Sequence, residues 1–264
     1  MIQEHFGAGQ SLGISVTSSS QSNGTNANST INGNGLDQQF DEASRFLGQA
    51  SLGANNELIT YVASIGAENW IDEQFASGMV NFRDTTQMIW DEFVLDYADQ
   101  WGPDEVFGND ALFPIATYWR MAWWNNVMKS DDQLRQRVAL ALSEIMVVLE
   151  KSQLELHAMG LADYYDQLYH NAFGNYRDLI EDVTLHPSMG FYLSHLNNEK
   201  SNEELNIHPD ENYAREVMQL FSIGLYELNI DGSLVLDQND APVPTYNNDD
   251  IKEFAKIFTG LGPA

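Results

Sequence analysis

Residues 208–221 carry the most varied set of functional groups in this chain. Successive residues of a helix lie 100° apart, so this segment, as a helix, would present one polar row and one apolar side. The polar row consists of Asn212, Arg215, Glu216 and Gln219. A carboxylic acid held beside a guanidinium can serve as a general acid or base. The candidate catalytic residues of a hydrolase are therefore Glu211, Glu216, His208 and Arg215.

Two other interpretations of the polar row stay open. The row could bind a ligand without catalysis, or it could be a solvated face or a hydrogen-bonded network between helices. The candidate ligand-binding residues are Asn212 and Gln219 from the row, and Arg135 and Glu144 from the helix expected at 134–149. An enzyme should gather such side chains around a pocket. A binding module should instead bury the row in hydrogen bonds and expose aromatic side chains elsewhere.

Three histidines are candidate metal ligands: His186, His195 and His208. His186 and His208 each precede a proline that suits the first turn of a helix. The helix dipole there favours the neutral imidazole that binds metals, although a capping or packing role is the alternative. The chain contains no His-x-x-x-His or Glu-x-x-His pair, so the zinc-protease and di-iron signatures are absent. No nucleotide or flavin motif occurs, and a divalent cation is the one cofactor left open.

The composition excludes several classes of function. Asp and Glu number 39 against 12 Lys and Arg, for a net charge of −27, so nucleic acid is not an expected partner. Cysteine is absent, which excludes disulfides and thiolate catalysis. No stretch reaches the ~20 apolar residues of a transmembrane helix. Residues 1–12 lack the basic start and apolar core of a signal peptide.

Two regions follow from the pattern along the chain. Residues 1–39 are rich in Ser, Asn and Gly and predict a flexible tail or linker. Residues 40–264 show apolar residues at helical spacing and predict a mainly α, multi-helix, orthogonal or bundle-like single domain. Within it, Asp231-Gly232 predicts the turn of one small β-hairpin at about 226–236.

Two helical segments have particular interest. The apolar stripe at 134–149 predicts a central, buried helix, preceded by a capping box in which Gln133 reaches back to Ser130. The segment 111–128 contains Phe113, Tyr118, Trp119, Trp123 and Trp124. Aromatic rings at helical spacing favour the core, although they could also form a ligand platform.

Several segments together resemble one bacterial family, the domain of unknown function 1800. They begin with 43–50, 134–145, 172–179 and 181–187, and continue with 208–228 and 258–260. The resemblance implies a helical protein that is commonly exported to the periplasm or the medium, with no established activity. It also implies that this chain is the N-terminal portion of a longer family domain, because members usually continue beyond Phe258-Thr-Gly260. Many members carry Trp where Leu261 stands here.

From the row and the resemblance together we expect a secreted or periplasmic helical protein. It would bind or help process an extracellular ligand, with a polymer favoured, through the polar site on residues 208–226. A hydrolase and a purely structural or assembly domain are the alternatives, and a partner protein is the alternative to a polymer.

Overall fold

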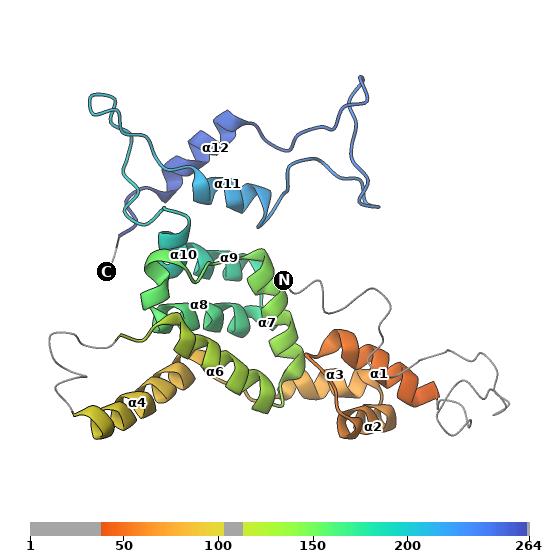
Figure 1. Cartoon of the computed structure of the whole chain (residues 1–264). Helices are drawn as coiled ribbons and strands as arrows, with labels where there is room; N and C mark the ends of the chain where they lie inside the picture. The colour runs from red at the N-terminus through yellow and green to blue at the C-terminus, as the bar shows by residue number, and fades with distance from the viewer. Residues whose placement is uncertain (1–37, 103–112, 263–264) are drawn as a thin grey trace, which may run out of the picture. The chain divides into compact units, whose positions relative to one another are not determined.

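The computed structural model describes residues 38–102 and 113–262, and these lie mainly in helices, as predicted (Figure 1). Residues 1–37, most of the predicted flexible tail, lie outside the described part of the chain. The described residues group into two compact units, one ending at Ser77 and the other beginning at Gly78.

The described residues of the first unit form α1 (Gln38–Ala50), α2 (Asn56–Ile65) and α3 (Ala67–Ala76). Leu47 of α1 and Val62 of α2 are buried. The Phe46 and Trp70 rings meet edge to face with centroids 5.4 Å apart. Gly66 ends α2 at a φ of +84°, a backbone conformation that glycine adopts without strain. The chain therefore turns directly from α2 into α3.

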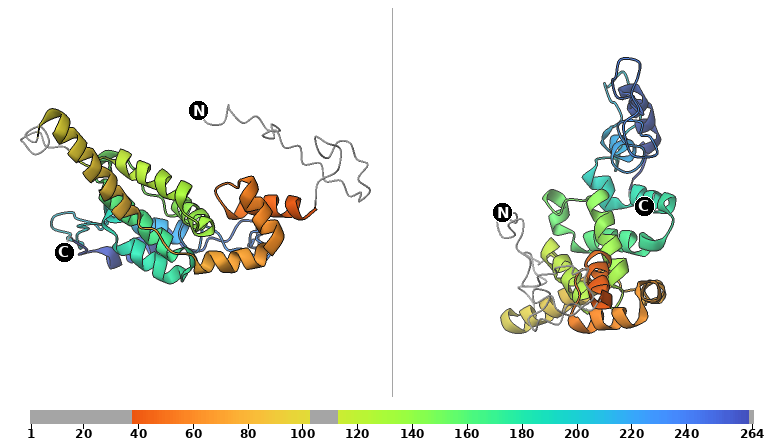
Figure 2. Two further views of the ribbon diagram at one scale, coloured as in Figure 1. Left: turned by 90° about the horizontal axis from the view of Figure 1, so that it is seen from below. Right: turned by 90° about the vertical axis from the view of Figure 1, so that its right-hand side faces the viewer.

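The second unit contains the remaining helices. They are α4 (Phe82–Trp101), α6 (Ala116–Lys129), α7 (Gln133–Ile145), α8 (Ala158–His170), α9 (Tyr176–Leu185), α10 (Pro187–Tyr192), α11 (Asn212–Gln219) and α12 (Asn248–Ala255). Short 3-10 helices lie at η1 (Ser152–Leu156), η2 (Asn171–Phe173) and η3 (Lys256–Phe258). Within this unit, α11 and α12 lie at the end away from α4 and α6 (Figures 1 and 2).

α8 is the central helix of this unit. Its Tyr164 and Leu168 belong to a core shared with α9, α10, α11 and α12, whereas Tyr165 and Tyr169 belong to one shared with α4, α6 and α7. The prediction of a buried centre at 134–149 is wrong, because α7 ends at Ile145 and that residue is exposed. α8 can contribute to both cores because its neighbouring buried residues Tyr164 and Tyr165 point about 100° apart around the helix.

The predicted capping box before α7 is also wrong. Asp132 is the residue that precedes α7, and Ser130 instead ends α6. The Ser130 amide and hydroxyl both donate to the Asn126 carbonyl, at 2.9 and 2.6 Å. Gln133 donates to the Ser130 carbonyl at 2.8 Å. The connection between α6 and α7 is so short that Ser130 caps the C-terminus of α6 and does not cap the N-terminus of α7.

Residues 224–246 form a lobe of paired extended segments between α11 and α12 (Figure 1). The predicted hairpin is present as an antiparallel bridge between Leu228 and Leu234, with Gly232 at a φ of +81° in the turn. Further bridges join Leu236 to Pro242 and Tyr226 to Pro244. A third segment therefore pairs with both arms of the hairpin, and long continuous strands do not form.

Candidate functional site: a tryptophan pocket between three helices

The helix of the polar row begins later than its sequence predicts. α11 starts at Asn212, and Pro209 precedes it instead of occupying its first turn. The Asp210 carboxylate accepts a hydrogen bond from the Asn212 amide at 2.8 Å, and the Asp210 amide donates to Asn198 Oδ1 at 2.8 Å. A short acidic side chain that bonds the backbone two residues onward makes a local turn. This turn anchors the segment to Asn198 before the helix begins.

Glu211 and Arg215, which lie four residues apart, form an ion pair. Glu211 Oε2 and Arg215 Nη2 lie 3.2 Å apart, and the two side chains are 33% and 39% exposed. Solvent screening at this exposure limits the contribution to stability to about 0.5 kcal/mol. The guanidinium of Arg215 is therefore engaged by its own helix.

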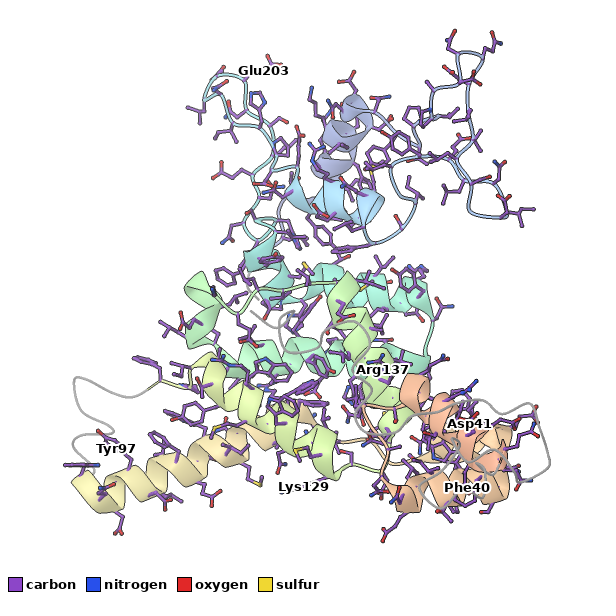
Figure 3. All side chains as sticks on the ribbon, turned by 45° about the vertical axis from the view of Figure 1, so that its right-hand side comes forward. Phe40, Asp41, Tyr97, Lys129, Arg137 and Glu203 are labelled. Carbon is purple, nitrogen blue, oxygen red and sulfur yellow. The ribbon has the colours of Figure 1, made fainter. Side chains whose placement is uncertain are left out.

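The rest of the row does not gather into a cluster. Asn212 and His208 are exposed, and Gln219 and Glu216 are half-buried. His208 follows a turn whose tip is marked by Glu203 in Figure 3. Glu216 Oε2 is buried and has no hydrogen-bond partner. In the part of the chain that the structure describes, no hydrogen bond or ion pair joins these four predicted residues to one another.

His195 is a buried histidine that packs against α11. Its ring lies 4.0 Å from the Tyr213 ring, centroid to centroid, with 31° between their planes. His195 Nε2 lies 2.9 Å from the Thr184 carbonyl oxygen, which can only accept, so Nε2 carries the proton. Burial lowers the pKa of His195, and the Thr184 contact and the charge of Asp210 oppose this effect. His195 is therefore a neutral packing residue here.

His186 lies in a different, charge-paired cluster. Its Nδ1 accepts from the Ser188 amide at 3.1 Å, which leaves Nε2 to donate to Asp163 at 3.2 Å. Asp163 also pairs with Arg83 at 3.2 Å. Burial lowers the pKa of His186, and Asp163 opposes this effect. The Ser188 hydroxyl donates to the Gly160 carbonyl at 2.9 Å and not to the imidazole, so no activated serine forms here.

The structure places the three predicted metal ligands in separate surroundings. His186 and His195 have the partners just described, and His208 is exposed. Among residues 38–102 and 113–262, no group of three or more His, Asp or Glu side chains is placed to hold a metal ion. These histidines therefore make no shared centre within the described residues.

Arg135 and Glu144, the expected ligand contacts on α7, have different surroundings. Arg135 is only 7% exposed, and its guanidinium carbon lies 4.3 Å from the centre of the Phe173 ring. Its Nη1 lies 3.5 Å from the Tyr169 carbonyl oxygen. Glu144 is exposed. Within the described ranges no hydrogen bond or ion pair joins either residue to α11, and Arg135 instead connects α7 to η2 and the end of α8.

A hollow of about 270 Å³ lies between α6, α7 and α8, and we call it the tryptophan pocket. Its buried lining includes Trp119 from α6 and Leu161 and Tyr165 from α8. Trp123 is half-buried, and Trp124 is 60% exposed at the opening. In Figure 3 the side chains of α6, the helix that ends at the labelled Lys129, meet those of α8.

Polar groups also line this pocket. Glu150 accepts from Trp119 Nε1 at 2.8 Å and lies 3.4 Å from Arg120 Nε, so its charge is paired. The Tyr165 hydroxyl is buried without a hydrogen-bond partner; the Trp123 indole approaches it outside normal hydrogen-bond geometry. Burial raises the pKa of Tyr165 to about 12, so its hydroxyl stays protonated at neutral pH. The pocket therefore offers aromatic walls beside a compensated ion pair, and the Tyr165 hydroxyl is buried behind these walls.

The expectation that the aromatic segment packs in the core is confirmed for Trp119 and wrong for Trp124 and Phe113, which are exposed. Neighbouring residues of a helix point 100° apart, so Trp123 and Trp124 cannot both face one core. This doublet is the sequence signal that could have revealed the pocket. Tyr165 lines the pocket from another helix, α8, and no local sequence pattern predicts its place there.

A second hollow, of about 520 Å³, lies beside the starts of α8 and α10. Its lining is mainly apolar and includes Leu156, Met159, Pro187 and Phe191. The Ser188 hydroxyl there is already bonded to a carbonyl. Neither hollow is lined by a residue of α11.

None of the helices in the described residues is long and apolar enough to cross a membrane. A sequence model of the family described as "Protein of unknown function (DUF1800)" matches residues 45–264, which is most of the chain. No curated protein and no solved structure matches it.

Proposed function

Given that the chain belongs to the DUF1800 family, we propose that it is a ligand-binding helical domain of an exported or envelope-associated protein. It engages an extracellular polymer at the tryptophan pocket. The export follows from the family resemblance, and a net charge of −27 suits solubility outside the cell. The proposal moves the site from α11, where the sequence pattern points, to α6, α7 and α8.

The observation that carries this proposal is the convergence of Trp119, Trp123 and Trp124 on an open hollow that polar side chains also line. Ligand sites combine apolar and aromatic walls with a few well-placed polar groups. The predicted catalytic residues on α11 line neither hollow, and their one ion pair, between Glu211 and Arg215, lies within the segment itself. Binding without catalysis fits this separation better than hydrolysis does.

The test compares two tryptophans that are equally exposed. Trp124 borders the pocket and Trp101 ends α4 outside it, and each is 60% exposed. Soluble polymers are titrated into the full chain while its tryptophan fluorescence is followed. We expect Trp124→Ala to weaken binding by about tenfold, because an aromatic contact contributes roughly 0.5–1.5 kcal/mol beyond area burial. Trp101→Ala should bind as the unmodified protein does. Equal loss in both variants, or no response from the unmodified protein, would refute the proposal.

A hydrolase that uses Glu211, Glu216, His208 and Arg215 is a second candidate, and one observation favours it. Glu216 has a buried carboxylate oxygen without a partner, which is a suitable state for a group that exchanges a proton with a substrate. Incubation of the full chain with the bound polymer should then release shorter products, and Glu216→Gln should stop this without weakening binding. An intact polymer after prolonged incubation would exclude the hydrolase and leave a binding or assembly domain.

A further inference from the structure

We propose that the tryptophan pocket is a subsite for one neutral sugar ring of a polysaccharide. This inference rests on the proposed binding function and names the ligand class for the same pocket. It follows from the size of the pocket, the orientation of its aromatic rings, the Ser143 hydroxyl in its lining and its balanced charge.

The size of the pocket limits the ligand to about one ring. Its volume is about 270 Å³, just below the ~300–1,000 Å³ of pockets that enclose drug-sized molecules. The side chains of Trp124 and Arg120 are exposed where the pocket opens. One unit of a polymer can therefore enter while neighbouring units pass over the opening.

The aromatic rings suit a molecule with an apolar face and a polar edge. The Trp123 and Trp124 ring centroids lie 4.9 Å apart with 85° between their planes, so the two indoles present nearly perpendicular surfaces. A pyranose ring has C–H groups on its faces and hydroxyl groups around its edge. One indole can stack against such a face while the other borders the edge, and both gain from apolar contact.

The polar groups of the lining favour a ligand that itself carries hydroxyls. Ser143 is half-buried and lines the pocket. Its hydroxyl donates to the Leu140 carbonyl at 2.7 Å and retains lone pairs that can accept. A sugar hydroxyl can donate to Ser143, which a purely apolar ligand cannot do.

The charges of the pocket favour a neutral ligand. The carboxylate of Glu150 is paired with Arg120 and bonded to the Trp119 indole, so it is not free to hold a quaternary ammonium group. The chain has a net charge of −27, which repels a polyanion. An uncharged sugar ring satisfies both conditions.

The experiment separates this inference from the proposed function. The full chain is run in native gels that contain neutral glucan, mannan, xylan or galactan. It is also run in gels that contain dextran or dextran sulfate, which share one backbone and differ in charge. Choline and tetramethylammonium are titrated by tryptophan fluorescence. The variants are Trp124→Ala, Ser143→Ala and the control Trp101→Ala, each checked for an unchanged melting temperature and near-ultraviolet circular dichroism. Ser143→Ala removes only the hydroxyl from the lining of the pocket.

We expect retardation by at least one neutral polysaccharide. Trp124→Ala should weaken it about tenfold, and Ser143→Ala about fivefold, as for one lost hydrogen bond. Binding only to dextran sulfate or to the ammonium compounds, with the same loss in Trp124→Ala, would overturn the neutral sugar and retain the binding function. No binding to any of these probes would overturn the sugar assignment. If other polymers also leave the fluorescence of the unmodified protein unchanged, the proposed function fails with it.

Discussion

The hydroxyl groups of Tyr213 and Thr184 lie 2.6 Å apart and join α11 to α9 within the core of the second unit. The Thr184 hydroxyl already donates to the Ile180 carbonyl at 2.6 Å, so Tyr213 is the donor of the pair. The Thr184 carbonyl accepts from His195, whose ring packs on that of Tyr213. This arrangement holds the apolar side of α11 in the core.

Tyr213→Phe should therefore lower the free energy of unfolding by about 1 kcal/mol, because it removes one buried hydrogen bond and keeps the ring. Chemical denaturation of the variant and the unmodified protein measures this difference. The matched control is Tyr226→Phe, since Tyr226 is exposed in the lobe and should change stability by less than about 0.5 kcal/mol. Equal effects of the two changes would contradict the buried hydroxyl pair.

Stability should decline as the pH falls below neutrality. Burial lowers the pKa of both His186 and His195 in the folded protein. The unfolded chain binds protons at these residues once the pH drops below about 6.5, and the folded protein takes them up only at lower pH. Full stability is therefore present above about pH 6.5, and part of it is lost as the pH falls toward the lowered pKa values. Urea unfolding at pH 7.5 and 5.5 tests this, and a flat profile would be inconsistent with it.

Glu216→Gln should leave stability unchanged or raise it by about 1 kcal/mol, because it removes the charge from a buried oxygen without a partner. A member of a buried ionic network would instead lose roughly 3–5 kcal/mol. Glu211→Gln is the control, since it breaks the ion pair with Arg215 and should cost about 0.5 kcal/mol. Thermal or urea unfolding compares the two. A large loss at Glu216 would indicate a counter-ion for this carboxylate.

Asp166 connects α8 to the first turn of α4. Its carboxylate accepts from the Phe82 amide at 2.8 Å and from the Arg83 amide at 2.9 Å, and it is buried. Asp166→Ala leaves two helix-start amides without an acceptor and should cost about 2–4 kcal/mol. Asp84→Ala, an exposed change in the same turn, should cost less than about 1 kcal/mol. Comparable losses in the two variants would argue against this contact as the main anchor of α4.

Features that depend on near neighbours in the chain could be predicted from the sequence. The helical spacing of apolar residues predicted helices here, and Ala43 and Leu47 of α1 and Tyr213 of α11 are buried in them. The Asp231-Gly232 turn appears with its antiparallel bridge between Leu228 and Leu234. Each of these features depends on residues only a few positions apart, so the local pattern contains most of the information.

The pocket could not be predicted in this way, because its lining comes from three helices and the loop after α7. Trp124 and Tyr165 are far apart in sequence, and only the packing of α6 on α8 brings their surroundings together. The polar row on α11 attracted attention because its residue types are chemically versatile. The structure gives most of them separate surroundings.

The sequence by itself determined a helical, strongly acidic, cysteine-free protein and the turn at Asp231-Gly232. Only the tertiary structure decided that α8 is the central helix, that His195 is a neutral packing residue, and that Trp119, Trp123 and Trp124 line one pocket. The physical reason is that secondary structure follows from local spacing and capping. Burial, the pKa of a side chain and the lining of a pocket depend instead on which distant segments pack together.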